Sequence, residues 1–249
     1  MNSAFFKRIA LALAIGLIAA PANANVVISG TRVIYPATAR EVTVKLNNEG
    51  AMPVLVQTWI DDGDASAGAQ QRPMPFSLTP PVFRIDPARG QMLRVTYSGE
   101  PLPADRESVY WLNVLEIPPK AQVSDEESKL QLAFRTRIKL FFRPAGLPGE
   151  ADAAAAKLDW SFAQAANGGG KVALLAKNPT PYHVSVTQAS VQIDGQTHAS
   201  APGMIAPLEE REFVLEGLRQ IPQEAARIRF ETINDYGANV PAAFPPDEH

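Results

Sequence analysis

A run of alternating residues near the middle of the chain is the feature that most constrains the fold. Between Leu130 and Phe142 every even position but one holds Leu, Ile or Phe, whereas most odd positions hold Gln, Arg or Lys. Successive side chains of a β-strand point to opposite sides, so alternation of this length predicts a strand with one apolar face. Four cations gather towards its end: Arg135, Arg137, Lys139 and Arg143.

Shorter segments of the same character precede and follow this run. Proline makes up 22 of the 249 residues, about 9% against an average of roughly 5%, and long helices tolerate it poorly. Short strands separated by turn residues favour an all-β sandwich architecture. We expect Val54–Ile60 to be buried on both sides. The other expected strands are Val26–Ser29, Arg32–Tyr35, Glu41–Leu46, Gln91–Tyr97, Ser108–Ile117, Leu158–Phe162, Lys171–Lys177, Tyr182–Thr187, Ser190–Ile193, Glu212–Leu215 and Ala226–Ile233.

The first 24 residues have the pattern of a secretory signal peptide. Lys7 and Arg8 precede an apolar run of about 12 residues, too short for a membrane span of about 20, and Ala22-Asn23-Ala24 supplies a small-x-small cleavage site. We expect cleavage near Ala24 and export as a soluble protein without stable membrane insertion. The Pro- and Gly-rich stretch 143–149 then divides the mature chain into domains 25–145 and 146–249.

Composition and motifs exclude several classes of function. A formal charge of −3 excludes a strongly basic nucleic-acid binder. The chain has no cysteine and three histidines, so thiolate chemistry is absent and a His-rich metal centre is nearly excluded. The hydrolase nucleophile motif and a full phosphate loop are also missing. We therefore expect no catalytic residues, no metal and no cofactor.

The run from Leu130 to Phe142 leaves two readings open. On the edge of a sheet such a strand is an aggregation hazard. An exported protein that keeps it there would use it to pair with another chain, by main-chain hydrogen bonds and alternate side chains. Equally, it is an interior strand with ordinary burial. The pattern alone does not separate these readings.

Seven short blocks follow one another along the mature chain. They are residues 30–36 (GTRVIYP), 79–82 (TPPV), 105–108 (DRES), 113–119 (NVLEIPP), 137–144 (RIKLFFRP), 178–182 (NPTPY) and 233–237 (INDYG). In this order they resemble the periplasmic chaperones of pilus assembly by the chaperone–usher route, the PapD-like family. The resemblance spans essentially the whole mature chain and implies two immunoglobulin-like β-sandwich domains arranged in an L with a cleft between them. The loop before Leu130 is similar to that of the short-loop subclass.

The resemblance implies a function and a set of roles. The family binds, folds and caps unfinished pilus subunits by lending them a strand, and delivers them to an outer-membrane usher. Leu130, Leu132 and Phe134 match the lent strand, and Arg32 and Lys139 match two cations that bind the subunit's C-terminal carboxylate. Lys139 stands at an odd position and the three apolar residues stand at even ones, so on a regular strand they would point to opposite faces. Either a bulge lies between them or the strand presents its two faces to different surroundings.

Two further sets of positions follow from the same resemblance. Glu107, Arg143 and Asp235 match an inter-domain ion network that fixes the cleft angle. The usher-docking face would lie near Leu55, Pro81 and Val82. The free chain could also cover its exposed strand by self-association.

Two other classes of protein remain as alternatives. A secreted β-sandwich module that binds carbohydrate or a receptor would need an exposed aromatic platform, but Trp59, Trp111 and Trp160 are expected in the core. An exported enzyme on the same scaffold would need paired acids in a cleft in place of paired cations. The low histidine count and the absence of cysteine weigh against an enzyme.

Overall fold

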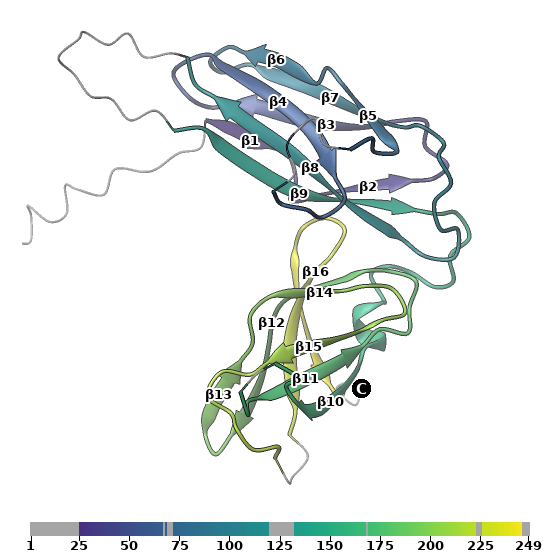
Figure 1. Cartoon of the computed structure of the whole chain (residues 1–249), viewed down its shortest axis with the longest axis vertical. Coiled ribbons are helices and arrows are strands. Elements are labelled where there is room, and N and C mark those ends of the chain that lie inside the picture. Colours follow the sequence, from purple (N-terminus) through teal and green to yellow (C-terminus); the bar gives the residue numbers. More distant parts are fainter. Residues whose placement is uncertain are drawn as a thin grey trace, which may run out of the picture.

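Two β-sandwiches, set at an angle to each other, make up the computed structural model (Figure 1). It describes residues 25–66, 68, 72–119, 132–167, 169–222 and 226–245. The strands of the first sandwich end at residue 143 and those of the second begin at residue 159. No α-helix occurs in these ranges, and none of their segments is a helix long and apolar enough to span a membrane. The predicted all-β fold of two immunoglobulin-like domains is confirmed.

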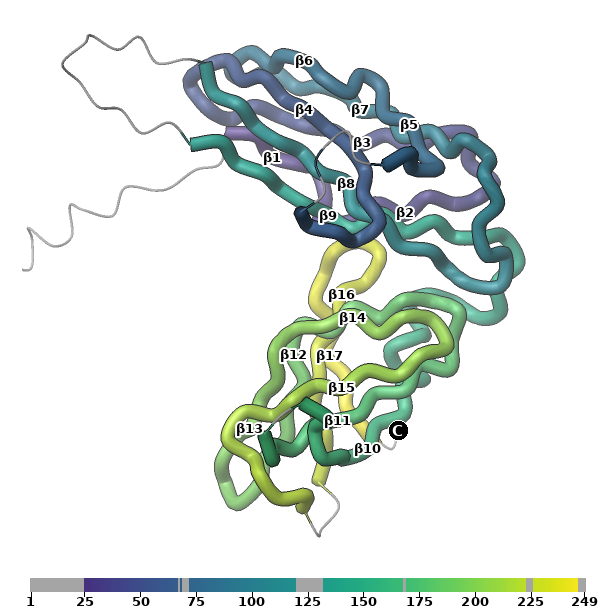
Figure 2. Tube along the Cα trace, in the orientation of Figure 1, coloured from purple at the N-terminus to yellow at the C-terminus, as the bar shows by residue number. Residues whose placement is uncertain are grey.

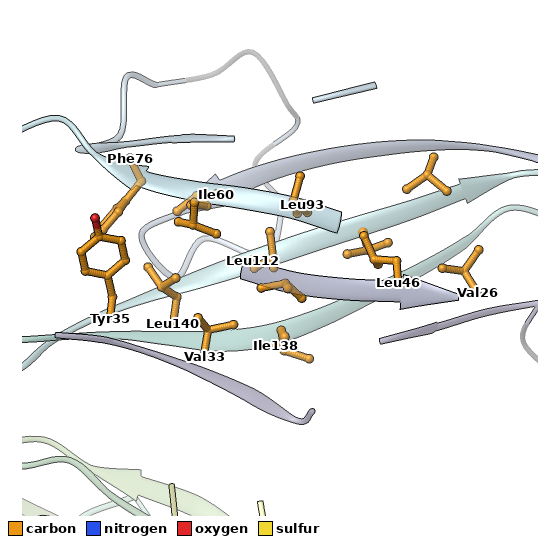
Figure 3. Close-up of a cluster of buried hydrophobic side chains, with 14 of the residues drawn as sticks. Val26, Val33, Tyr35, Leu46, Ile60, Phe76, Leu93, Leu112, Ile138 and Leu140 are labelled. Carbon is orange, nitrogen blue, oxygen red and sulfur yellow. The ribbon is translucent and has the colours of Figure 1, made fainter. Parts of the chain in front are cut away.

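Nine of the described strands form the first domain. A four-stranded sheet has the order β1-β3-β7-β5, and a five-stranded sheet has the order β2-β9-β8-β4-β6. Figure 3 shows the apolar side chains between them, among them Leu46, Leu93, Leu112 and Leu140. The strands are β1 (Val26–Ile28), β2 (Arg32–Pro36), β3 (Val42–Asn48), β4 (Val54–Asp61), β5 (Phe76–Thr79), β6 (Val82–Ile85), β7 (Gly90–Tyr97), β8 (Ser108–Ile117) and β9 (Phe134–Arg143).

In its described residues, the second domain has eight strands and one 3₁₀ turn. One sheet has the order β10-β11-β15, and the other has the order β13-β12-β16-β17 with β14 also paired to β12. Trp160 packs between Phe213 and Phe230 in its core. The elements are η1 (Ala155–Lys157), β10 (Asp159–Gln164), β11 (Val172–Lys177), β12 (Val184–Ile193), β13 (Gln196–Ala199), β14 (Gly203–Ile205), β15 (Glu210–Val214), β16 (Ile228–Ile233) and β17 (Asn239–Phe244).

Some expected elements differ from the observed ones. The two segments expected at Tyr182–Thr187 and Ser190–Ile193 form the single strand β12, which begins only at Val184. Its register against β16 shifts between Val186 and Gln188, as at a β-bulge. The two-sided burial expected for Val54–Ile60 is wrong, because Leu55 is 44% exposed. Strands β5, β6, β13, β14 and β17 were not predicted, since they are short or contain Gly or Pro, which weaken the period-two signal.

Strand β9 is both an interior strand and an open edge. It pairs with β8 along its whole length, from Phe134 opposite Glu116 to Phe142 opposite Ser108. On its other side, β2 pairs in parallel with the last five residues only, Lys139–Arg143. In the described part of the chain, the stretch from Phe134 to Ile138 therefore has a free edge, and the two readings of this strand apply to its two halves.

Candidate functional site

The two faces of β9 point to different surroundings. Its register against β8 is continuous, so no bulge lies between Phe134 and Lys139. Ile138 and Leu140, on the even face, enter the core of the first domain (Figure 3). Lys139, on the odd face, reaches the second domain. Even and odd residues of β9 therefore do face opposite sides, and the strand presents its two faces to different surroundings.

Arg32 and Lys139 lie side by side on adjacent strands and both reach across to the second domain. They are register partners in the parallel pair of β2 and β9. The Lys139 ammonium donates a hydrogen bond to Ser185 Oγ at 2.9 Å, and Arg32 Nη1 donates to the carbonyl oxygen of Ile233 at 2.8 Å. Both cations therefore stand at the junction of the two domains, at the inner end of the free edge of β9.

The charges of this pair are only partly compensated. Burial, followed by the positive charges of Arg32 and Arg211, lowers the pKa of Lys139 to about 8. Burial also lowers the pKa of Arg32, although the charges of Asp235 and Glu107 oppose that shift. The Nε of Arg32 is buried and has no hydrogen-bond acceptor among the described residues. An anion placed here would favour the charged form of Lys139 and could accept from both side chains.

An ion network beside this pair joins the two domains. Arg143 Nε donates to Glu107 at 2.7 Å, and its Nη1 and Nη2 donate to Asp235 at 2.6 and 3.0 Å. Burial alone would lower the pKa of Arg143, but these carboxylates raise it above its ordinary value. Glu107 also accepts from the backbone N–H of His183 at 2.9 Å, and its side chain is only 2% exposed. The structure thus brings Glu107, Arg143 and Asp235 together as the sequence suggested, and adds His183.

The loop between β16 and β17 carries the second domain's part of this junction. Figure 2 shows it reaching towards the first domain near β9. Asn234 closes the loop by accepting from the backbone N–H groups of Tyr236 and Ala238 through its side chain. Gly237 has φ +83°, and a Cβ there would lie 2.5 Å from Thr31 Oγ1. A glycine is therefore needed where the loop meets the residue before Arg32.

A cavity of about 200 Å³ lies at the same junction. Arg32, Arg143 and Glu107 line it from the first domain, and His183 and Asp235 line it from the second. The ion network thus forms one wall of the space beside Arg32.

Of the expected donor residues, Phe134 is the first residue of the free edge and Leu132 lies just before it. Leu132 and Phe134 are 54% and 50% exposed, which is unusual for large apolar side chains on the even face of a strand whose later members are core. Leu130 lies outside the described residues, as does the loop used to place the chain in the short-loop subclass. The exposed pair continues the row of Ile138 and Leu140 past the end of the core.

The other basic residues of β9 bind a buried acid. Asp61 forms hydrogen-bonded ion pairs with Arg137, and its pKa is lowered because hydrogen bonds, first from Arg137, outweigh the effect of burial. Arg135 and Arg137 lie over the rings of Trp59 and Trp111, at 5.0 and 4.9 Å from their centroids. The two tryptophans are half-buried on the outer face of the sheet, so their expected place in the core is wrong. Trp160 is buried as expected.

The expected usher-docking residues form one exposed apolar surface. Leu55 on β4 and Val82 on β6 are 44% and 50% exposed, and Pro81 is exposed beside them. Gln57, two residues along β4 on the same face as Leu55, pairs with Val82. The three residues therefore lie together on the first domain.

Several contacts of the junction were not predicted from the sequence. Ser185 and the Ile233 carbonyl hold Lys139 and Arg32, and His183 binds Glu107. All three come from the second domain, far along the chain from their partners. A histidine between Tyr182 and Val184 predicts a packing residue, and a single serine in a strand gives no signal at all.

Comparison with known proteins gives the same family for both domains. Residues 25–148 match the family model of the pili and flagellar-assembly chaperone, PapD N-terminal domain. Residues 153–244 match that of the pili assembly chaperone PapD, C-terminal domain. The chain is 45% identical over 228 residues to chaperone protein FimB/FhaD of Bordetella pertussis, covering 90% of this chain and 89% of that protein. It is 44% identical over 220 residues to the probable fimbrial chaperone YadV of Escherichia coli, covering 87% and 88%.

Solved structures agree with this assignment. The crystal structure of the YadV chaperone matches with a TM-score of 0.76 at 42% identity, over 88% of this chain and 98% of that chain. The Pseudomonas aeruginosa CupB2 chaperone matches with a TM-score of 0.72 at 40% identity, over 87% and 98%. The chain therefore belongs to the PapD family of pilus-assembly chaperones.

Proposed function

We propose that this chaperone acts in the periplasm and holds a pilus subunit by lending it the free edge of β9. The observation that carries the proposal is the arrangement along one strand. A free edge with exposed Leu132 and Phe134 leads directly to the partly uncompensated cations Lys139 and Arg32. A related chaperone, SafB, was crystallised in complex with the SafA pilin of Salmonella enterica, and it matches this chain with a TM-score of 0.72 at 27% identity, over 90% and 98% of the two chains.

From the geometry of β9 we infer the position and direction of a bound subunit strand. It would occupy the edge that β2 leaves free, next to residues Phe134–Ile138, and would end at Arg32 and Lys139. Because β9 runs from Phe134 towards Lys139, a subunit strand on this edge whose C-terminus faces the two cations would run parallel to β9, as β2 does beyond that point. Its terminal carboxylate would accept charge-assisted hydrogen bonds and fix the register, since a slip by one residue turns every side chain to the other face.

The remaining roles follow from the same proposal. Export requires a signal peptide, residues 1–24, whose removal N-terminal sequencing would detect as a start at Asn25. The chain 25–145 would then form the subunit-holding domain and 146–249 the second wall of the cleft. Leu55, Pro81 and Val82 would dock the outer-membrane usher, so that Leu55→Glu keeps the subunit but loses the usher. In the free protein the same edge would pair with a second copy, which light scattering would detect as a dimer.

The carbohydrate-binding alternative is less well supported. The two half-buried tryptophans, Trp59 and Trp111, would be its aromatic platform. Arg135 and Arg137 already lie over these rings, held there by Asp61 and Asn113. A sugar would have to displace two ion-paired side chains to stack on them. The proposal assigns the chain no enzymatic activity.

Co-purification from periplasm tests the proposal. We expect a small subunit to accompany the wild-type chain and to be lost with Arg32→Ala or Lys139→Ala, while circular dichroism shows that the fold persists. Arg94→Ala is the matched control, because Arg94 is an exposed cation on β7, 3.9 Å from Glu41. Equal recovery of the same partner with all four proteins would show that the carboxylate anchor is wrong.

A further inference from the structure

Arg211 is a cation of the second domain that has no carboxylate partner among the residues that the structure describes. It lies on β15, where its Nη1 donates to the carbonyl oxygen of Met204 at 3.1 Å and its guanidinium stands 5.8 Å from the ring centroid of Phe213. No ion pair joins it to a carboxylate in the part of the chain that the structure describes. Its charge is therefore available to a ligand.

The surrounding backbone directs this side chain across β14. A Cβ at Gly203 would lie 2.7 Å from Arg211 Nε and 2.8 Å from Phe213 Cε1, so the absence of a side chain at residue 203 provides the space that Arg211 occupies. The next residue, Met204, accepts from Arg211 and is the register partner of Ser185 in the pair of β12 and β14. Ser185 in turn accepts from the Lys139 ammonium. Arg211 thus stands one strand pairing away from Lys139.

Electrostatics supports this placement. The charge of Arg211 is one of the two that lower the pKa of Lys139 after burial. The positive charge of Arg32 is partly offset by Asp235 and Glu107. Within the described ranges, by contrast, Lys139 donates to the hydroxyl of Ser185 alone. One terminal carboxylate would therefore neutralise only part of the positive charge that Lys139 and Arg211 place on this side of the cleft.

We propose that Arg211 determines specificity in the cleft by binding an acidic side chain within the last three residues of the subunit, beside the terminal carboxylate that Arg32 and Lys139 hold. The inference rests on the proposed function, because it takes that carboxylate as the anchor. A strand advances about 3.3 Å per residue, so the last three residues extend only about 7 Å from the anchor. The preferred partner is thus a subunit with Asp or Glu near its C-terminus.

Synthetic peptides of ten residues with alternating Val and Thr test this. The parent has a free C-terminal carboxylate and no acidic side chain, and three others carry Glu at the last, second-last or third-last position, each matched by a Gln peptide. We expect one Glu peptide to bind the mature wild-type chain about threefold to tenfold more tightly than its Gln match, measured by fluorescence anisotropy. Arg211→Gln should abolish this preference and leave affinity for the parent unchanged, and Arg211→Lys should keep part of it.

Control variants distinguish a failure of the role of Arg211 from a failure of the carboxylate anchor. Arg229→Gln, on β16, removes an exposed cation of the same domain that lines a groove with Ser190 and should behave as wild type. If Arg211→Gln retains the full preference for Glu, or if no Glu peptide exceeds its Gln match, the role of Arg211 is wrong while the anchor stands. If the parent peptide binds Lys139→Ala as tightly as wild type, the anchor itself fails and this inference fails with it.

Discussion

If Lys139 binds the subunit carboxylate as proposed, we expect subunit binding to depend on pH. Its pKa of about 8 lies below the ordinary 10.5 because the ammonium is buried and stands near Arg32 and Arg211. A subunit carboxylate favours the charged form and raises the pKa again, so binding takes up a proton above pH 8. We expect calorimetry to show constant affinity below about pH 7 and a fall of up to about tenfold per pH unit above pH 8.

Lys139→Arg is the matched control for this effect. Arginine stays charged throughout this range, so its affinity should not fall between pH 8 and 10. The same fall in the variant would assign the pH dependence to another group. For folding of the free chain, the pH dependence has the opposite sign. Lys139 loses its proton near pH 8 in the native state but near pH 10.5 in the unfolded state. The free energy of unfolding should therefore rise with pH between these two values.

At the scale of the element, the alternation from Leu130 to Phe142 predicted the strand and its two faces, but neither its start at Phe134 nor its pairing. Side-chain pattern reports which face is buried, whereas pairing depends on where β2 begins, more than a hundred residues earlier in the chain. The basic odd positions read as one patch, yet Arg135 and Arg137 bind Asp61, while Lys139 and Arg143 face the second domain. Alternation cannot separate these surroundings, because they come from other strands.

Substitutions at two apolar residues of β9 should affect subunit binding and stability differently. Phe134 is half exposed and Ile138 is core. We expect Phe134→Ala to change the free energy of unfolding by less than about 1 kcal/mol, measured in urea, but to weaken subunit binding by about 1.5–3 kcal/mol as its buried contact in the complex is lost. Ile138→Ala should instead destabilise the chain by about 2–5 kcal/mol. Equal destabilisation by the two changes would place Phe134 in the core of the free protein.

For the whole molecule, the motifs shared with the family indicated which residues join the domains, but not what else meets there. Glu107, Arg143 and Asp235 could be named from the sequence because each stands in a short recognisable block. The contacts of Ser185, His183 and the Ile233 carbonyl depend on the angle between two independently folded sandwiches. No local propensity encodes that angle, so these contacts could not be predicted before the domains were placed.

We expect removal of Arg143 from the ion network to lower the free energy of unfolding more than removal of Asp235. Arg143→Leu leaves the Glu107 carboxylate buried without its cation, which we expect to cost about 3–5 kcal/mol of stability. Asp235→Ala leaves Arg143 paired with Glu107 and removes only the bonds between Arg143 and the second domain, so it should cost about 1.5–3 kcal/mol. Small-angle scattering should then show a wider range of inter-domain angles for Asp235→Ala, while Arg94→Ala stays as wild type. Unchanged scattering together with full subunit binding by Asp235→Ala would mean that the remaining contacts, among them Lys139 with Ser185, Arg32 with the Ile233 carbonyl and Glu107 with His183, suffice to fix the cleft.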